Sequence, residues 1–285
     1  MPRVSVVIPA YKSKRFIGEA VDSVLRQTFV DYEVIVVDDG CPEGTGRFVE
    51  ETYGDRVTVI EQKNGGPAVA RNTGIQRSTG EWVAFLDSDD HWQPQKLEVQ
   101  LETARENPEY GLISSSYYKL EGGRHFERKR HGRSGWVFTD VFMANYIRTS
   151  TVMIRSDCFE SVGLFDTNLP LTQDYDMWLR MSRRYQVGYI NEALATYRHH
   201  PAGISRDVLE SRSYFLKILQ KNYDPETIPE HLYRKRIGYV HYHLAKHCRG
   251  EEFVAKAREH ALEAVRLCPW RVRYWWRYLK TRVAR

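Results

Sequence analysis

The 285-residue sequence predicts an α/β fold, in which a mostly parallel central sheet is flanked by helices and is followed by a helical C-terminal annex. Two observations lead to this prediction. Up to about residue 90, short apolar runs alternate with segments of helical periodicity, and the links between them are short. From about Arg206 onward, the sequence contains amphipathic helical patterns. We therefore expect one domain over residues 1–206 and a helical extension over residues 207–285.

Four short apolar runs, rich in β-branched residues, are typical of strands buried on both faces of a sheet. These runs cover residues 4–8, 32–40, 57–61 and 82–87. The segment after each run has apolar residues at helical spacing, and the four segments cover residues 16–25, 45–54, 66–80 and 94–108. Because strand–helix–strand units with short links build parallel sheets, we expect helices on the faces of this sheet.

Residues 110–205 follow a more mixed pattern. It predicts strands over residues 111–120 and 150–155, a mobile loop or hairpin tip over 121–134, a helix over 173–185 and a strand-like segment from residue 187. Ser156 is placed to cap a short helix over residues 158–163.

Composition and charge narrow the class of protein. The formal charge of +5 comes from 42 Lys and Arg against 37 Asp and Glu, and we expect no nucleic-acid partner from so mild an excess. The four cysteines form no C-x-x-C pair, which favours reduced thiols in a cytoplasmic protein. We expect neither a signal peptide nor a transmembrane helix, because no stretch approaches about 18–20 apolar residues.

Three carboxylates lie within four residues at the end of the fourth predicted strand, in the stretch "AFLDSDDHWQP". Asp87, Asp89 and Asp90 repel one another when ionised, so a positive group is expected among them. Oxygen ligands at D-x-D spacing suit Mg²⁺ or Mn²⁺. The alternative is that these aspartates cap the helix that begins near Pro94. The D-x-D spacing alone does not distinguish the two.

Other polar residues fall at the carboxyl ends of the predicted strands, where open α/β sheets bind their ligands. Pro9-Ala10-Tyr11 follows the first strand. Asp38 and Asp39 follow the second, where an acid binds a ribose hydroxyl or a base N–H, or forms a turn before a glycine. Arg71 is placed to meet a phosphate or a base, or is an ordinary surface arginine.

The sequence lacks G-x-x-x-x-G-K-[ST] and has no G-x-G-x-x-G after the first strand, so a P-loop NTPase is excluded and a dinucleotide-binding fold is disfavoured.

Seven blocks in order resemble the inverting, family two glycosyltransferases with the GT-A fold, over roughly residues 3–206. They are "VSVVIPAYK", "YEVIVVDDG", "NGGPAVARNTGI", "WVAFLDSDDHWQPQKL", "TSTVMIRSDCFESVGLFD", "QDYDMWLRM" and "YRHHPAGIS". The resemblance implies transfer of a sugar from a nucleotide-diphosphate sugar to a hydroxyl of a glycan or lipid-linked glycan, as in cell-envelope polysaccharide biosynthesis. It does not specify the sugar, the nucleotide or the acceptor.

The resemblance also implies roles for individual residues. The nucleotide would be bound by Pro9, Ala10, Tyr11, Asp39, Arg71 and Ser88, with Tyr11 as a stacking surface and Asp39 on the base or ribose. The diphosphate would be bound by Arg198 and His200. Where relatives usually have "DDGS", this chain has Cys41, which we expect to affect only the turn.

Metal binding and catalysis follow from the same resemblance. Asp87 and Asp89 would hold Mn²⁺ or Mg²⁺, and Asp174 would be the catalytic base. Many relatives have Glu-Asp where this chain has Gln173-Asp174, but the base position itself is intact. Asp176 ranks well below Asp174, since it also fits a structural role in the helix. A base on the face of the sugar opposite the leaving diphosphate gives inversion without a covalent intermediate.

Two other functions remain open. A sugar nucleotidyltransferase also combines a sheet, acids and a metal, but it would carry a Gly-rich, Lys-containing signature near the first strand. A catalytically weak nucleotide- or carbohydrate-binding relative is disfavoured because all the expected acids are present.

The segment over residues 269–285, "PWRVRYWWRYLKTRVAR", is aromatic, and all its charged residues are basic. Such a helix can lie on an anionic membrane with its aromatic residues at the interface, or its aromatic residues can pack against the protein. Peripheral contact with the inner face of the cell membrane would suit a lipid-linked acceptor.

Overall fold

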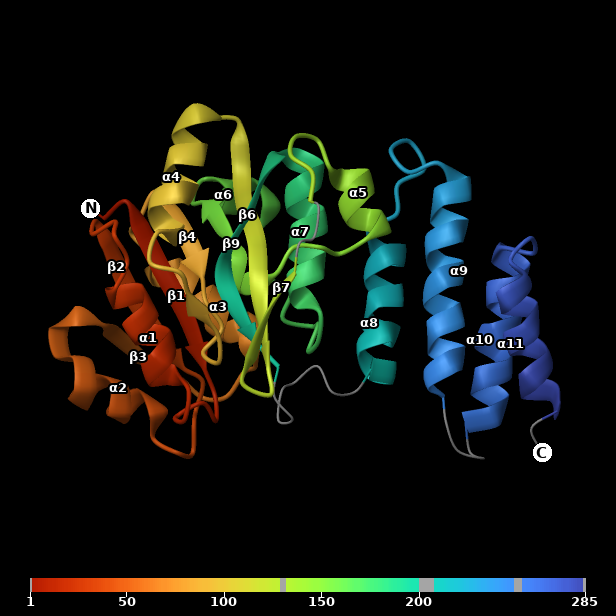
Figure 1. Cartoon of the computed structure of the whole chain (residues 1–285), viewed down its shortest axis with the longest axis horizontal. Coiled ribbons are helices and arrows are strands. Elements are labelled where there is room, and N and C mark those ends of the chain that lie inside the picture. The colour runs from red at the N-terminus through yellow and green to blue at the C-terminus, as the bar shows by residue number, and fades with distance from the viewer. Residues whose placement is uncertain (1, 129–131, 200–207, 249–252, 284–285) are drawn as a thin grey trace. The chain divides into compact units, whose positions relative to one another are not determined.

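The computed structural model describes residues 2–128, 132–199, 208–248 and 253–283. The chain forms two compact units (Figure 1). Unit 1 comprises Met1–Val141 and Tyr146–His200, and unit 2 comprises Phe142–Asn145 and Pro201–Arg285. The boundary expected between residues 206 and 207 lies outside the described residues.

Unit 1 is built on one sheet, which has nine strands among the described residues, in the order β3-β2-β1-β4-β8-β6-β9-β5 with β7 paired to β6. The strands are β1 (Val4–Ala10), β2 (Tyr32–Asp38), β3 (Thr58–Glu61), β4 (Trp82–Phe85), β5 (His91–Trp92), β6 (Tyr110–Glu121), β7 (Arg124–Arg128), β8 (Met153–Arg155) and β9 (Gln186–Arg198). Strands β1 to β4 pair in parallel, as do β6 and β9, whereas β8, β5 and β7 run antiparallel to their neighbours.

Helices cover both faces of this sheet. The helices of unit 1 are α1 (Ile17–Leu25), α2 (Thr45–Tyr53), α3 (Pro67–Arg77), α4 (Lys96–Glu106), α6 (Cys158–Val162) and α7 (Gln173–Arg184), with short 3₁₀ helices η1 (Gly54–Arg56) and η2 (Thr149–Thr151). The short helix α5 (Phe138–Met143) begins in unit 1 and ends in unit 2. Side chains alternate between the faces of a strand, so Val6 and Ile8 of β1 pack with α1, α2 and α4. Val7 faces α3 on the other side. The α/β class with a central sheet between helices is thereby confirmed.

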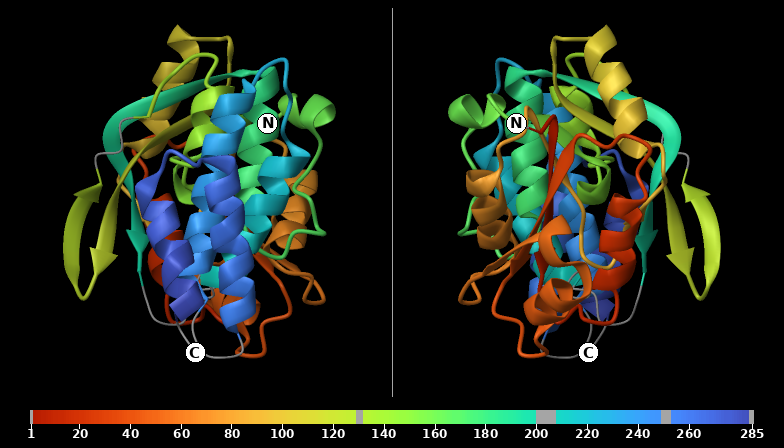
Figure 2. Two further views of the ribbon diagram at one scale, coloured as in Figure 1. Left: turned by 90° about the vertical axis from the view of Figure 1, so that its right-hand side faces the viewer. Right: turned by 90° about the vertical axis from the view of Figure 1, so that its left-hand side faces the viewer.

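Continuous apolar runs explain why the central strands form where the sequence predicts them. β1, β2 and β4 are almost completely buried, as expected for strands covered on both faces. Gly122 and Gly123 have positive φ angles of 57° and 76°, and they join β6 to β7 through a two-residue hairpin. Figure 2 shows this hairpin projecting away from the rest of the sheet. Residues 129–131, in the same basic segment, lie outside the described part of the chain.

Two local predictions need correction. The strand expected over residues 150–155 is shorter, because Thr149–Thr151 forms a 3₁₀ turn before β8. Ser156 does not cap α6 with its side chain, since its hydroxyl donates to the Gly80 carbonyl at 2.6 Å. Both segments are held by contacts with distant parts of the chain.

Unit 2 contains four further helices among the described residues, α8 (Val208–Lys221), α9 (Glu230–His247), α10 (Val254–Leu267) and α11 (Val272–Val283). A small core joins α10 and α11 and contains Ala264, Val265, Cys268 and Tyr274. Tyr274 stacks on Tyr242 of α9 with 4.9 Å between ring centroids. In the described part of the chain, we find no helix with the length and apolar character needed to span a bilayer.

Candidate active site

The loop after β4 carries the three clustered aspartates. Ser150 of η2 holds this loop from two sides, because its hydroxyl accepts from the Asp87 N–H at 3.2 Å and donates to Asp90 Oδ2 at 2.5 Å. The helix that follows, α4, has Gln95 as its N-cap and no side-chain capping bond. The alternative that the aspartates cap this helix is therefore wrong.

Arg71 of α3 pairs with the first of these acids. Its Nη2 donates to Asp87 Oδ1 at 2.6 Å, and its guanidinium lies 5.7 Å from the centroid of the Phe165 ring. Only 6% of the Arg71 side chain is exposed, so it is not an ordinary surface arginine. Its Nε and Nη1 are covered from solvent and have no hydrogen-bond partner among the described residues. One cation is thus fixed beside the acid cluster.

Asp90 is the buried member of the cluster. Burial, followed by the negative charges of Asp89 and Asp87, raises the pKa of its carboxyl well above the usual range. Bonds from the Ser150 hydroxyl and the Arg198 N–H act in the opposite direction. The Asp90 carboxyl therefore ties the loop after β4 to η2 and β9, while Asp87 and Asp89 lie nearer the surface.

Arg198, at the end of β9, lies beside the same loop. Its backbone N–H donates to Asp90 Oδ1 at 2.8 Å, and its Nε donates to the Asp89 carbonyl at 2.9 Å. Its guanidinium also pairs with Glu19 of α1 and lies 5.0 Å from the centroid of the Phe16 ring. Arg198 therefore lies beside the cluster of acids, and its binding of the diphosphate stays a prediction. His200 lies outside the described residues.

The two aspartates after β2 differ in their contacts. The Asp38 carboxylate accepts from the backbone N–H groups of Cys41 at 2.7 Å and Gly46 at 2.5 Å, so it shapes the turn. The Asp39 carboxylate accepts from the Gly65 and Gly66 N–H groups at 2.9 and 2.8 Å, and from Gln62 Nε2. In this structure the glycine backbone approaches the Asp39 carboxylate.

The segment after β1 lies beside the Asp39 turn. Asp39 donates its N–H to the Ala10 carbonyl at 2.9 Å. Tyr11 is 42% exposed, and the Lys12 ammonium lies 5.2 Å from the centroid of its ring. Lys12 has a φ angle of +50°, which is uncommon for a residue with a side chain, and its N–H donates to Cys41 Sγ at 3.1 Å. Cys41 thus links the two turns without any need for thiol chemistry.

Asp174 lies in the first turn of α7, after Thr172, whose φ of +60° is also uncommon. Its Oδ1 accepts from the Tyr175 N–H at 2.8 Å, and its Oδ2 accepts from the Thr149 hydroxyl at 3.4 Å. Burial raises the pKa of Asp174, and the positive charge of Arg71 opposes that rise. The charge of Arg148 lowers this pKa as well, and that of Asp87 raises it. Asp174 thus belongs to the same electrostatic cluster as Arg71 and Asp87.

Asp176 has a different role. It is fully buried and pairs with Arg180 Nε at 2.8 Å, and Arg180 in turn donates to the carbonyls of Val162 and Leu164. This network joins α7 to the end of α6, which agrees with a structural acid.

The residues around the acid cluster fit a divalent cation. Among the described residues, no set of three or more His, Cys, Asp or Glu side chains converges as a ligand set. Mg²⁺ usually takes only one or two protein carboxylates and completes its shell with water and phosphate oxygens. Asp87 is 32% exposed at its side chain, and the negative charges of Asp87 and Asp89 both raise the pKa of Asp90. This excess of negative charge would be relieved by a bound cation.

Sequence reasoning did not single out three residues of this region. Ser150 lies within the quoted block "TSTVMIR", but nothing in the block indicates that its hydroxyl joins Asp87 to Asp90. Glu19 occupies an exposed helical position, and its pairing with Arg198 needs the sheet to be formed. Arg148 lies over the Tyr117 and Tyr197 rings, 5.6 and 5.0 Å from their centroids, which no local pattern indicates.

The fold as a whole resembles solved glycosyltransferase structures of the GT-A type. A *Staphylococcus aureus* TarS structure in complex with UDP superposes with a TM-score of 0.71 at 16% identity, covering 94% of this chain and 81% of that one. A mannosyltransferase from *Pyrobaculum calidifontis*, in complex with GDP-Man and Mn²⁺, gives a TM-score of 0.66 at 19% identity, covering 93% and 75%. These likenesses confirm the fold class.

The model of glycosyl transferase family 2 matches residues 5–212, and the chain belongs to this family. The putative teichuronic acid biosynthesis glycosyltransferase TuaG of *Bacillus subtilis* is 33% identical over 69% of this chain and 79% of its own length. An uncharacterized glycosyltransferase of *Rickettsia typhi* is 32% identical over 77% of this chain and 73% of its own. An uncharacterized glycosyltransferase of Rickettsia bellii is 36% identical over 69% of this chain. That match spans only 29% of the length of the R. bellii protein.

Proposed function

We propose that this protein is an inverting glycosyltransferase that moves a sugar from a nucleotide-diphosphate sugar to a hydroxyl of a glycan or lipid-linked glycan. Membership of glycosyl transferase family 2 supports the reaction class. The complexes of TarS with UDP and of the *P. calidifontis* enzyme with GDP-Man support a nucleotide-sugar donor. The teichuronic acid assignment of TuaG supports a glycan of the cell envelope as acceptor.

One observation carries the proposal: the partly buried Asp174 carboxylate at the start of α7 belongs to the same group of interacting charges as Arg71 and Asp87 at the carboxyl end of β4. Asp174 is close enough to Arg71 and Asp87 for both charges to act on its pKa. The cluster suits the diphosphate end of a donor, and the carboxylate suits the acceptor hydroxyl. A sugar between them would have its leaving group and its nucleophile on opposite sides.

Asp174 is the proposed general base. Its raised pKa makes it a stronger proton acceptor than an exposed aspartate, while Arg71 and Arg148 help to keep it ionised near neutral pH. It would take the proton from the acceptor hydroxyl as that oxygen bonds to the anomeric carbon. The bond to the diphosphate breaks at the opposite side, so an α-linked donor would give a β-linked product.

The donor diphosphate is the proposed ligand of the acid cluster. Asp87 and Asp89 would hold Mn²⁺ or Mg²⁺, whose charge neutralises the negative charge that develops on the departing diphosphate. Arg71 would orient the Asp87 carboxylate through the 2.6 Å bond, which leaves the second Asp87 oxygen for the cation. Arg198 would add a positive charge on the β9 side, and His200 remains a predicted contributor.

The nucleotide is proposed to lie over the ends of β1 and β2. Tyr11 offers an exposed ring for stacking beside Pro9 and Ala10. The Asp39 carboxylate accepts three hydrogen bonds within the protein, and two carboxylate oxygens have about four acceptor positions. It can therefore accept one more donor from the base or ribose. Ser88 remains a predicted nucleotide contact.

The base assignment is tested with Asp174→Asn. Asparagine keeps the size of the side chain but cannot accept the proton, so the turnover rate should fall by about 10²–10⁴-fold, with donor binding unchanged. Asp157→Asn is the matched control, because it removes an exposed acid in the same unit and should leave turnover intact. Full activity of Asp174→Asn would exclude Asp174 as the base. Release of pyrophosphate from an NTP and a sugar phosphate would instead indicate a nucleotidyltransferase.

A further inference from the structure

Helix α11 in unit 2 has one face packed and another face exposed. Tyr274 and Thr281 are buried, and Tyr274 belongs to the core shared with α10. Arg277 donates from Nε to the Ala245 carbonyl at 3.2 Å, and Arg258 donates from Nη2 to the Thr281 carbonyl at 3.2 Å. These contacts fix the orientation of α11 within unit 2, so the direction of its other face is defined.

The exposed face is apolar. At about 100° per residue, Trp275, Leu279, Val272 and Trp276 fall within an arc of about 100° on the side of α11 away from Tyr274. We call these four residues the outer face. They are exposed to 43% (Trp275), 52% (Leu279), 78% (Val272) and 62% (Trp276), and Trp270, just before the helix, is 62% exposed. Soluble proteins rarely leave such residues contiguous and uncovered.

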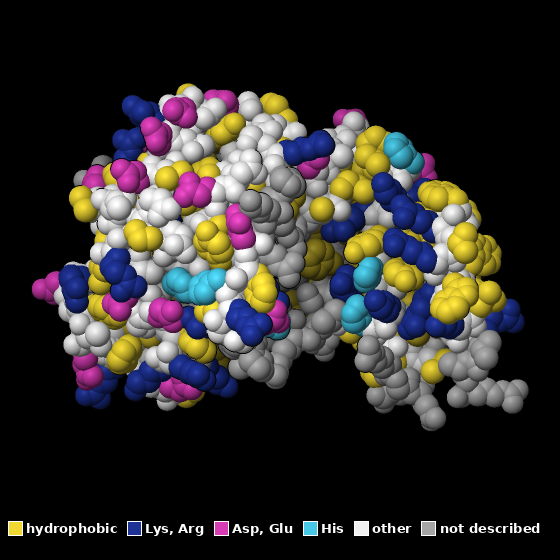
Figure 3. All heavy atoms as spheres, in the orientation of Figure 1, with side chains coloured by type: hydrophobic (Ala, Val, Ile, Leu, Met, Phe, Trp, Pro, Cys, Tyr) yellow, Lys and Arg dark blue, Asp and Glu magenta, His cyan; other side chains and the backbone are white. Residues whose placement is uncertain are grey.

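Cations border the outer face on both sides. On the same helical wheel, Arg282 lies at one edge of the apolar arc, and Lys280 and Arg273 lie at the other. The Lys280 ammonium sits 3.8 Å from the centroid of the Trp276 ring, and Arg273 lies over the Tyr242 and Tyr274 rings. The sequence has no acidic residue from 269 to 285. Figure 3 shows hydrophobic and basic side chains intermixed over the C-terminal helices.

We propose that the outer face of α11 docks on the surface of an anionic lipid bilayer. An apolar strip with tryptophan at its centre and Lys or Arg along both edges is the pattern of a helix that lies in the plane of a membrane interface. The tryptophan rings would enter the headgroup boundary, and the bordering cations would meet lipid phosphates. This proposal does not depend on the reaction proposed above.

The charges favour a bilayer over a second copy of the chain. A two-fold contact would place the same patch against itself, and the bordering Arg273, Lys280 and Arg282 would then lie close to the cations that border the other copy. Like charges opposed in this way disfavour association. A bilayer of acidic lipids supplies phosphate groups beside an apolar interior, which complements both parts of the outer face.

Co-sedimentation of the full chain with vesicles tests the proposal. The chain should pellet with vesicles of equal parts phosphatidylcholine and phosphatidylglycerol, and far less with phosphatidylcholine alone. Binding should weaken as NaCl is raised, because salt screens the attraction. The triple variant Arg273→Gln/Lys280→Gln/Arg282→Gln should bind about 100-fold more weakly, at roughly fivefold for each cation. Trp276→Ser/Leu279→Ser should also lose binding, and neither change touches the buried side of α11.

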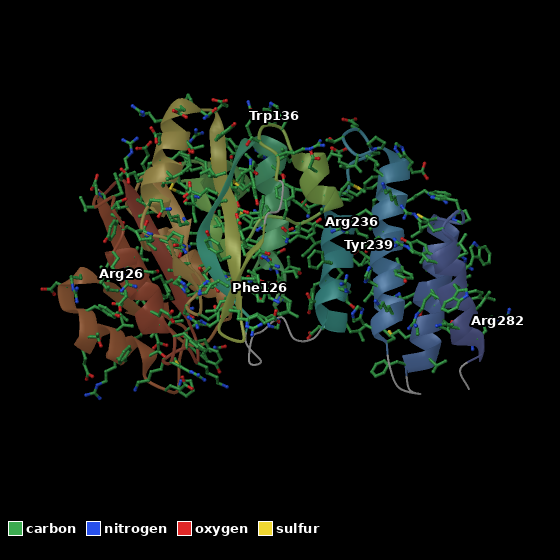
Figure 4. The ribbon with its side chains drawn as sticks, viewed as in Figure 1. Arg26, Phe126, Trp136, Arg236, Tyr239 and Arg282 are labelled. Atoms are coloured by element: carbon green, nitrogen blue, oxygen red, sulfur yellow. The ribbon has the colours of Figure 1, made fainter. Side chains whose placement is uncertain are left out.

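Matched controls come from unit 1, and Figure 4 shows the positions of Arg282, Arg26 and Trp136. Arg26→Gln/Arg47→Gln/Arg105→Gln removes the same net charge at exposed ion pairs, and Trp136→Ser removes a tryptophan that is 67% exposed. Both controls should bind as the unmodified chain does. Equal binding to neutral and anionic vesicles, or equal loss in the two triple variants, would overturn the proposal. A third outcome would also overturn the proposal: the chain pellets without vesicles, and Trp276→Ser/Leu279→Ser abolishes this pelleting. The outer face would then serve self-association.

Discussion

Burial and nearby charges have opposite effects on the pKa of the Asp174 carboxyl. Burial raises its pKa, and the charges of Arg71 and Arg148 lower it. Arg148 is held in this position because its guanidinium lies over two tyrosine rings and its Nε donates to the Tyr117 hydroxyl at 3.4 Å. The cation beside the proposed base is thus fixed by Tyr117 of β6 and Tyr197 of β9.

Arg148→Met should move the acid limb of the pH–rate profile to higher pH. The base must be ionised to act, so the rate falls as the pH drops through the pKa of Asp174. Removing a positive charge that lowers this pKa allows it to rise further. The measurement is turnover from pH 4 to 8, with Arg47→Met as an exposed control. An unmoved or downward-shifted acid limb would contradict the electrostatic role of Arg148.

The site residues differ in how far sequence could predict them. Asp87 and Asp89 are singled out by a local motif, because acids directly after a buried strand are visible in the sequence, whereas the role of Asp174 is implied only by the family resemblance. The pairing of Arg71 with Asp87, and the joining of Asp87 to Asp90 by Ser150, could not be predicted in this way. They depend on how α3 and η2 pack against β4, which is a tertiary property.

The packing of α3 on the sheet depends on a single glycine. A Cβ atom at Gly74 would lie 2.3 Å from Val7 Cγ1, which is closer than any real contact. Gly74→Ala should therefore lower the free energy of unfolding by about 1–3 kcal/mol. Gly18→Ala in α1 is the control, since its Cβ would meet the Tyr53 hydroxyl at an ordinary 3.6 Å. The control should gain up to about 1 kcal/mol from helix propensity.

Urea unfolding of the two glycine variants gives the comparison directly. The result expected from the packing is a lower midpoint for Gly74→Ala and an equal or higher midpoint for Gly18→Ala. If Gly74→Ala unfolded at the midpoint of the parent chain, the close approach of α3 to β1 would be wrong.

The contact between α9 and α10 should weaken in acid. His241 and His260 lie with their Nδ1 atoms 3.1 Å apart, and burial, followed by the charge of His260, lowers the pKa of His241 to about 4. The unfolded His241 would titrate near its ordinary value of 6.5, so the unfolded state binds more protons between pH 4 and 6.5. Stability present above pH 6.5 is therefore lost as the pH falls, by about 2 kcal/mol at pH 5.

Hydrogen exchange of the α9 and α10 amides in the whole chain measures this effect. After correction for the intrinsic pH dependence, exchange at pH 5 should be faster than at pH 7.5, and His241→Gln should reduce the difference. Identical pH dependence in the parent chain and in His241→Gln would rule out the histidine pair as the cause.

At the scale of elements, the periodic segments were the predictable ones. The four parallel strands and the helices between them are confirmed. Burial on both faces produces the continuous apolar runs of β1, β2 and β4, whereas β3, at the edge of the sheet, has no buried residue. β5 and α5 escaped prediction, since two residues of β5 and six of α5 are too short to establish a period. The hairpin of β6 and β7 was one of two alternatives for its segment, and the paired glycines of its turn decide in its favour.

At the scale of the whole molecule, the order of the elements defines the fold and the family. The loops at the carboxyl ends of β1, β2 and β4, where we propose that the donor binds, gather at one edge of the sheet, as the alternation of strands and helices predicts. The antiparallel β8 between β4 and β6 could not be derived from alternation, because it depends on pairing across a long stretch of chain. The helical nature of the C-terminal region is confirmed, and which face of α11 is exposed required the structure.

The most direct test of the proposed function is thermal unfolding of the chain with UDP-, GDP- and dTDP-sugars, each with Mn²⁺ and with EDTA. A ligand that binds only the folded state stabilises it by mass action, by about 2.7 kcal/mol at 100 times its Kd. We predict a higher Tm with sugars of one nucleotide and Mn²⁺, and loss of that rise with EDTA and in Asp89→Asn. No rise with any nucleotide sugar would contradict the metal–diphosphate site and the transferase proposed around it.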